Sequence, residues 1–222
     1  SDGKLVAENG VYFGNISRPE YPKSAYKTMN VKGPLTPESF RVTAPNGKSK
    51  VKVNVIGIRE GSILTDALVN EVPVVDGQIK ADPTGDLAKF AVIDRHTGSG
   101  RIGLGFIHRL GLKTGAIGSS FNPGLCNIAV VGTNDEDMAI VANRIAELGG
   151  AYVAAKDGKV IAELAMPLWG VLSDRPFEEA VEQLQNVNDA FHNDLGSDFR
   201  GYHIGAGLCC LPIIIPSLKI CD

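Results

Sequence analysis

The clearest pattern in this sequence is an alternation of hydrophobic and polar positions that begins at Lys50. Val51, Val53 and Val55 alternate with polar residues, and this period of two is typical of a strand with one buried face. The segment VPVVDGQIKAD continues the pattern around Asp76-Gly77, a dipeptide that favours a tight hairpin turn. LAKFAVIDRH is typical of a further strand, so this part of the chain is predicted to be rich in β-structure.

A helical period appears after CNIAVVG, a short apolar run that itself predicts a strand. Thr133 and Glu136 have the spacing of a capping box, and the acidic residues at 135–137 would lie in the first turn, near the positive end of the helix dipole. Gly149-Gly150 would end the helix. A helix is therefore predicted near residues 134–148, with these residues on its buried face: Met138, Val141, Ile145 and Leu148.

A second helix is predicted near residues 175–195, after a hairpin around Asp157-Gly158. Asp174 is placed to cap it, and Pro176 would lie in its first turn. Its predicted buried stripe consists of Phe177, Val181, Leu184, Val187 and Phe191. The closing segment LCCLPIIIPSLKI is expected to be a buried strand that ends at a proline.

The order of these elements favours an α+β fold over residues 46–222, in which a mixed β-sheet is layered with helices. Residues 1–45 contain turn signals at Asp2-Gly3 and Asn9-Gly10 and then a proline-rich stretch, which indicates a β-hairpin and a linker. We expect this segment to pack poorly in isolation, because its short strands would expose their edges unless a neighbouring copy pairs with them.

The composition narrows the classes of partner. The chain has 222 residues, 44% of them hydrophobic, and a net charge of −3 with scattered Lys and Arg, so no nucleic-acid partner is expected. Its longest apolar run, 208–215, is broken by Pro212 and is too short to span a membrane, which favours a cytoplasmic location. Four cysteines without regular spacing are expected to be buried free thiols: Cys126, Cys209, Cys210 and Cys221.

No self-sufficient catalytic motif is present, such as a nucleophile elbow, a P-loop or a His-Glu-x-x-His pair. The best candidates for a site lie on loops at strand ends: Arg95, His96, Ser119, Ser120 and Asn122. Serine and asparagine there would either bind the edge of a purine or cap turns. The glycines between 98 and 105 imply that the backbone closely approaches a ligand or, as the favoured alternative, another strand.

No metal site is predicted on this chain. His96, His108 and Cys126 are conceivable zinc ligands, but their spacing is unconstrained. The acidic cluster at 135–137 lacks the alternating ligands and the closing glutamate of a Ca²⁺ loop. Trp169 is expected to be a packing anchor where the chain leaves the second hairpin.

Several segments in the same order resemble the C-terminal domain of bacterial and archaeal adenine deaminases, in the amidohydrolase superfamily. They are RHTGSGRIGLGF, GLKTGAIGSS, NIAVVGTNDEDMAIVANRIAELGG, DGKVIAELAMPLWGVLSD and LPIIIPSLKICD. SDGKLVAENG resembles the stretch where such enzymes return from a metal-binding barrel to a small β-sandwich. The resemblance implies hydrolytic deamination of adenine by a metal-bound water, with Mn or Fe held in a barrel that has no counterpart in these residues.

The chain departs from this family in one loop. After Ser-Ser the family pattern is Val-Ala-His-Asp-Ser-His-Asn, whereas this chain reads FNPGLCN, so that Pro123, Gly124 and Cys126 replace two histidines and an aspartate. Asn127 matches the pattern, as does the Arg95-His96 pair, and the resemblance therefore adds Asn127 to the candidate substrate-binding residues.

Two hypotheses follow. In the first, the chain is part of an aminohydrolase acting on adenine or a related base, its partners are the barrel domain and further copies of the same chain, and the chain alone is inactive and binds no catalytic metal. In the second, it is a non-catalytic domain for assembly or for binding a purine-like small molecule.

Overall fold

The computed structural model describes residues 3–14, 20–62, 65–122 and 126–200, and it shows the predicted α+β fold. The first strands are β1 (Ala7–Glu8), β2 (Val11–Tyr12), β3 (Val42–Thr43), β4 (Lys50–Ile58), β5 (Thr65–Val75) and β6 (Gln78–Ile79). They are followed by β7 (Leu87–Ile93), β8 (Ile102–His108), β9 (Ala116–Ser119), β10 (Ile128–Gly132), β11 (Ala151–Lys156) and β12 (Lys159–Ala165). The helices are α1 (Asp135–Glu147), α2 (Phe177–Asp189), the short 3-10 helices η1 (Lys23–Tyr26) and η2 (Pro37–Phe40), and the π-helix η3 (Ala190–Asp194).

Ten strands form one mixed sheet in the order β12-β11-β9-β10-β7-β8-β4-β5-β6-β3. Strands β4 and β8 pair in parallel, and the other described pairs of the sheet are antiparallel. The turns at Asp76-Gly77 and Asp157-Gly158 have the positive φ angles that such hairpins require, as predicted. Gly103 and Gly105 lie in β8 opposite β7, which confirms that the glycine segment approaches another strand.

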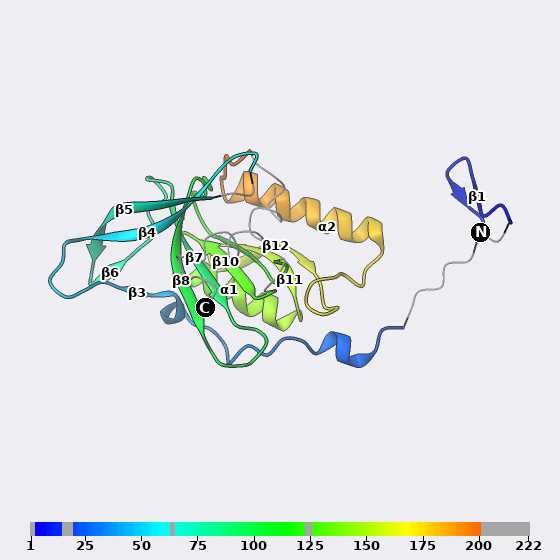
Figure 1. Cartoon of the computed structure of the whole chain (residues 1–222), viewed down its shortest axis with the longest axis horizontal. Helices are drawn as coiled ribbons and strands as arrows, with labels where there is room; N and C mark the ends of the chain where they lie inside the picture. The colour runs from blue at the N-terminus through cyan, green and yellow to red at the C-terminus, as the bar shows by residue number, and fades with distance from the viewer. Residues whose placement is uncertain (1–2, 15–19, 63–64, 123–125, 201–222) are drawn as a thin grey trace.

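Both faces of the sheet centre are covered, and every residue of β7 is therefore buried (Figure 1). Phe90 and Val92 belong to a core cluster that includes Phe191, next to α2. Ala91 and Ile93 belong to a second cluster that includes the apolar side chains of α1. Because successive side chains of a strand point to opposite faces, α1 and α2 cover opposite sides of the sheet.

Helix α1 occupies the range predicted for it, but its cap lies one residue later than predicted. Asn134 is the N-cap, and its Oδ1 accepts a hydrogen bond from the backbone N–H of Asp137 at 2.7 Å. The hydroxyl of Thr133 donates instead to the carbonyl oxygen of Gly115 at 3.1 Å. The predicted Thr133 capping box is therefore wrong, because a tertiary contact occupies that side chain.

Helix α2 is also in the predicted place, but two expectations about it are wrong. Its N-cap is Pro176 and makes no side-chain cap hydrogen bond, so Asp174 is not the cap. The members of the predicted stripe that pack against the sheet are Leu184, Val187 and Phe191. Phe177 and Val181, in the first turns, are exposed.

The segment before β4 packs better than predicted. Ala25 in η1 and Phe40 in η2 are buried, and Phe40 joins the cluster under α1, so the expected poor packing is wrong for residues 20–44. The hairpin β1–β2 is different, since Leu5 and Phe13 beside it are exposed. Trp169, expected to be a packing anchor, is nearly half-exposed, and its ring packs edge-on against that of Tyr21.

Two further expectations concern the cysteines and the closing strand. Cys126 is a half-buried free thiol, whereas Cys209, Cys210, Cys221 and the predicted strand over 208–215 lie outside the described residues. None of the helices in the described part of the chain is long and apolar enough to cross a membrane.

Candidate functional site

The predicted site residues lie at one edge of the sheet. Ile128, the first residue of β10, pairs with Ile93 at the end of β7, and Ala129 pairs with Ser119 at the end of β9. The loops that leave these strands therefore meet: Arg95 bonds to Cys126 and Asn127, and Asn122 bonds to Asn127. Ser120 bonds to Gly170, next to Trp169, whose carbonyl oxygen also accepts from Arg95. His96 follows Arg95 on the same loop but has an exposed side chain.

Arg95 connects three separate loops. Its guanidinium is buried and donates from Nε to the carbonyl oxygen of Cys126, from Nη1 to the carbonyl oxygen of Thr28 at 3.3 Å, and from Nη2 to that of Trp169 at 3.1 Å. Burial lowers the pKa of Arg95 from its usual value. Its hydrogen-bond partners within the described ranges are main-chain oxygens and the Thr28 hydroxyl, so this side chain holds backbone segments together.

Ser119 and Ser120 also bond to the backbone. The hydroxyl of Ser119 accepts from the N–H of Phe121 at 2.9 Å. The hydroxyl of Ser120 donates to the carbonyl oxygen of Gly170 at 2.6 Å and accepts from the N–H of Ala151 at 3.0 Å. Both serines are fully buried: Ser119 stabilises a local turn, whereas Ser120 joins its loop to Gly170 and Ala151, which are distant in the sequence.

The two asparagines close the loop that begins at Ser120. Asn122 donates from Nδ2 to the carbonyl oxygen of Asn127, and Asn127 Oδ1 accepts from the backbone N–H of Arg95 at 3.4 Å. Asn122 is buried, and within the described ranges its Oδ1 has no hydrogen-bond partner. Between the two asparagines, Pro123 and Gly124 lie outside the described residues, and Cys126 is in a left-handed conformation at φ 50°.

Asp94 organises the neighbouring loop and was missed by the sequence analysis. Its carboxylate accepts from the hydroxyls of Ser99 and Thr97 and from the backbone N–H of His96 at 2.9 Å. These hydrogen bonds, first from Ser99 and then from Thr97, hold the pKa of Asp94 well below its usual range. An aspartate followed by Thr and Ser three and five residues later, at a strand end, was the available signal.

The histidines and the cysteine considered as zinc ligands lie in different parts of the sheet and its loops. In the part of the chain that the structure describes, no three His, Cys, Asp or Glu side chains are grouped so that they could hold a metal ion. His108 lies in β8, whereas His96 and Cys126 belong to the loops at the sheet edge. Asp135 forms an ion pair with Lys89 at 2.6 Å, and the Asp137 carboxylate accepts hydrogen bonds from Asn134 Nδ2 at 2.8 Å and from the backbone N–H of Gly158 at 2.9 Å.

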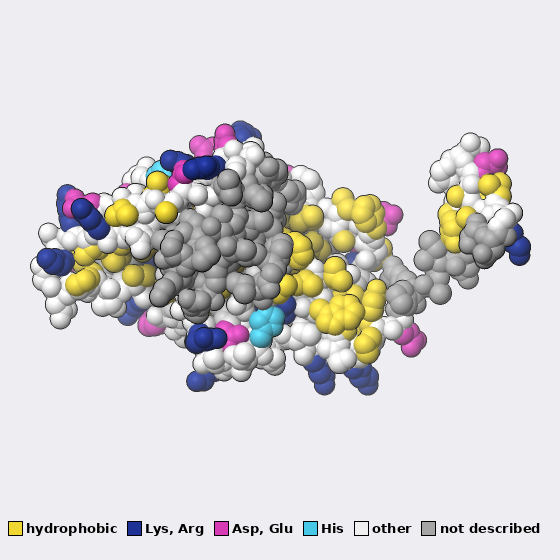
Figure 2. Space-filling view, in the orientation of Figure 1, with side chains coloured by type: hydrophobic (Ala, Val, Ile, Leu, Met, Phe, Trp, Pro, Cys, Tyr) yellow, Lys and Arg dark blue, Asp and Glu magenta, His cyan; other side chains and the backbone are white. Residues whose placement is uncertain are grey.

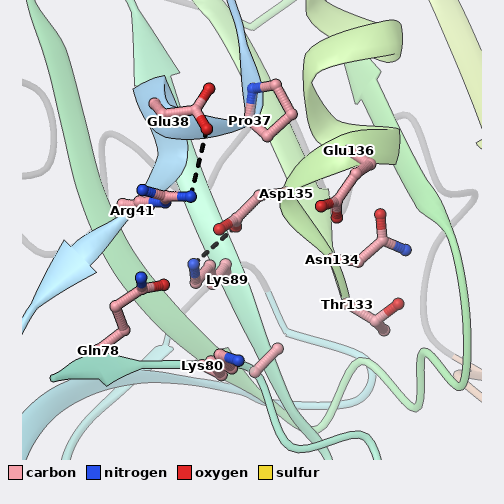
Figure 3. A pocket seen from close by; sticks show the side chains of 11 residues that line it. Pro37, Glu38, Arg41, Gln78, Lys80, Lys89, Thr133, Asn134, Asp135 and Glu136 are labelled. Carbon is pink, nitrogen blue, oxygen red and sulfur yellow. Dashed lines mark hydrogen bonds and ion pairs between the residues drawn. The ribbon is translucent and has the colours of Figure 1, made fainter. Parts of the chain in front are cut away.

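A polar cavity of about 450 Å³ lies between η2, β6 and the N-terminus of α1 (Figure 3). Its cations already have acidic partners within 4.0 Å: Lys89 pairs with Asp135, Arg41 with Glu38, and Lys80 with Asp76. Figure 3 shows the Lys89 and Asp135 side chains facing one another. In the sequence, the signal for this cavity was Lys89 within the apolar run LAKFAVI. Because the cations of the cavity are paired with acidic side chains, the charges do not indicate a particular ligand.

Comparisons with known proteins identify relatives of this chain. A family model described as "Adenine deaminase C-terminal domain" matches residues 62–222. Adenine deaminase of Moorella thermoacetica is 42% identical over 219 residues, which are 99% of this chain and 36% of the relative. Adenine deaminase of Methanothrix thermoacetophila is 37% identical over 221 residues, which are 100% of this chain and 37% of the relative. The chain thus spans about a third of the length of the curated relatives that it matches.

Proposed function

Because this chain belongs to the adenine deaminase C-terminal domain family, we propose that it is the C-terminal portion of a metal-dependent enzyme that converts adenine and water into hypoxanthine and ammonia. One observation carries the proposal. Relatives named adenine deaminase align with 95–100% of this chain at 36–42% identity, and the aligned region is a minor part of each relative.

We assign the chemical step to the part of the enzyme that this chain does not contain. Activating water at neutral pH requires a metal held by several His and carboxylate ligands. The described residues do not fit such a metal, since no three of these side chains come together. We therefore derive no catalytic step from this chain, and we place the Mn or Fe of the reaction in the barrel that the resemblance implies.

The proposed contribution of this domain is to position a loop at the edge of its sheet. Arg95, Ser119, Ser120 and Asn122 are buried, which favours a role in shaping the loop over direct contact with adenine. The carbonyl oxygen of Asn127 accepts a hydrogen bond from Asn122 in the same loop, and its Oδ1 accepts from the backbone N–H of Arg95 at 3.4 Å. His96 has an exposed side chain, so it is the candidate that we propose for contact with a purine-like ligand.

The test is to assay the full-length protein that carries this domain for ammonia and hypoxanthine, with adenine, guanine and cytosine as substrates and with Mn²⁺ or Fe²⁺ added. Turnover of adenine in preference to the other two bases would support the proposal. Turnover of another base would refute adenine as the substrate. Absence of turnover in folded protein with metal bound would support the non-catalytic alternative.

A further inference from the structure

Exposed apolar side chains gather around the loop that joins β12 to α2. Phe177 and Trp169 are 77% and 46% exposed, although both are large and apolar. Figure 2 shows hydrophobic side chains over the N-terminal end of α2 and over the loop before it (yellow). We define the apolar patch as Tyr21, Tyr26, Trp169, Leu172, Phe177 and Val181, all of which are at least 40% exposed.

The backbone of Trp169 is held in a conformation that presents its ring to solvent. Its φ is +53°, a left-handed value that costs a bulky residue about 1–3 kcal/mol. Two hydrogen bonds fix it, since its N–H donates to the carbonyl oxygen of Ala25 at 2.7 Å and its carbonyl oxygen accepts from Arg95 at 3.1 Å. The ring meets the ring of Tyr21 edge-on, with centroids 6.2 Å apart. Backbone strain that the surrounding structure maintains in this way often marks a functional surface.

Helix α2 gives independent evidence that the apolar patch is an interaction surface. Its apolar stripe runs along its whole length, but only the C-terminal part packs on the sheet. Phe177 and Val181 continue the same stripe without cover from the described residues. An amphipathic stripe normally lies against another element, and exposed apolar side chains that gather on one surface often mark an interaction site. Charged residues flank the patch, including Lys23 and Glu178, as they do at the rims of protein interfaces.

The path of the chain indicates what covers the patch. Tyr21 and Tyr26 belong to the segment through which the polypeptide enters this domain, and η1 is held beside Trp169 by the hydrogen bond to Ala25. About two thirds of the length of the relatives lies outside the aligned region, and the matching model is that of a C-terminal domain. The preceding part of the longer chain is therefore tethered next to the patch, and tethering raises its effective concentration there.

We propose that the apolar patch is the surface on which the preceding, N-terminal part of the longer adenine deaminase chain packs. This inference rests on the proposed function, because it assumes that the chain is the C-terminal portion of such an enzyme. The partner is an apolar surface of the same polypeptide, and the aromatic side chains of the patch are its anchors.

Hydrogen exchange tests the proposal in the full-length protein and in the 222-residue chain, whose three core clusters lie within residues 40–199. Backbone amides of the first two turns of α2 should exchange about tenfold or more slowly in the full-length protein, because burial of Phe177 and Val181 stabilises that region. The double variant Phe177→Ser/Val181→Ser should abolish this difference. It should leave the unfolding of the 222-residue chain unchanged, because both side chains are exposed there. The matched control, Val69→Ser/Val75→Ser on the exposed face of β5, should leave the protection intact.

Three results would overturn the proposal. Equal exchange in both proteins at all concentrations would mean that the patch is uncovered or is covered by residues 201–222. Protection of the 222-residue chain that rises with its concentration would identify a second copy as the occupant. Protection that survives the Phe177→Ser/Val181→Ser change would place the contact elsewhere.

Activity measured on the same full-length samples separates this inference from the proposed function. Turnover of adenine without slower exchange would refute the docking surface and leave the function standing. Slower exchange without turnover of adenine would refute the function and leave the docking surface standing.

Discussion

Arg95 donates a hydrogen bond from Nη2 to the main-chain oxygen of Trp169 at 3.1 Å, across 74 positions of the sequence. This bond links the loops that follow β7 and β9, at the edge of the sheet, to the apolar patch. Arg95 also bonds to the carbonyl oxygens of Cys126 and Thr28. One buried cation therefore holds three backbone segments in place: the one around Thr28, the loop that contains Cys126, and the loop between β12 and α2 that contains Trp169. The role of Arg95 in this chain is thus to position backbone.

The first prediction concerns that role. Arg95→Met should lower the free energy of unfolding by about 2–4 kcal/mol, because it leaves three main-chain oxygens without their donor. Chemical denaturation of the 222-residue chain would measure the change. Arg101→Met is the matched control, since Arg101 is exposed and its loss should change stability by less than about 0.5 kcal/mol. An Arg95 variant as stable as this control would contradict the positioning role.

The space beside Gly170 gives a second prediction. A Cβ at this position would collide with the Arg95 guanidinium, and φ there is +73°. Gly170→Ala should therefore destabilise the chain by about 2 kcal/mol more than Gly158→Ala. Gly158 has a similar φ of +78°, but a Cβ added to it would meet no atom within 4 Å, so it isolates the effect of the collision. If Gly170→Ala and Gly158→Ala lowered the free energy of unfolding equally, in thermal or chemical unfolding, Arg95 would be able to move aside without loss of stability.

A third prediction concerns acid stability. Hydrogen bonds from Ser99 and Thr97 lower the pKa of Asp94, so its carboxylate stabilises the fold at pH values above the unfolded pKa of about 3.9. This contribution is lost as the pH falls towards the folded-state pKa. Asp94→Asn should therefore destabilise the chain by about 1–3 kcal/mol at pH 7, and the difference from the unsubstituted chain should shrink near pH 3.

Urea unfolding at both pH values would measure this difference. Asp76→Asn is the control, because the Asp76 side chain is 85% exposed and should show little effect at either pH. If the loss caused by Asp94→Asn were the same at pH 7 and near pH 3, ionisation of Asp94 would not be its source.

Local patterns were enough to predict most of the fold. The hairpins at Asp76-Gly77 and Asp157-Gly158 and the alternation in β4 depend on neighbouring residues alone, and the structure confirms them. The cap of α1 was wrong by one residue because the Thr133 hydroxyl bonds to Gly115, a distant contact that no local pattern contains. The periodicity of α2 showed that it has an apolar stripe, but it could not show how far the sheet covers that stripe.

The site was less predictable than the fold. The candidate residues were chosen as loop positions at strand ends, and the antiparallel pairing of β7, β9 and β10 brings those ends to one edge; whether they bind a substrate stays a prediction. The partners of Arg95 could not be predicted, since Thr28 and Trp169 reach it only through tertiary packing. The role of Asp94 had a local signal, the hydroxyl residues that follow it, but that signal was not used.

Whether catalysis belongs to the part of the enzyme outside this chain is tested by comparing adenine turnover by the 222-residue chain and by the full-length protein, with Mn²⁺ or Fe²⁺ added and with metal content determined after dialysis. We expect ammonia release and retained metal for the full-length protein, and neither for the 222-residue chain. Sustained turnover with stoichiometric metal in the 222-residue chain would contradict this expectation, because residues such as His96, His108 and Cys126 would then have to form a catalytic site. A full-length protein that retains metal but releases no ammonia from adenine would contradict it equally.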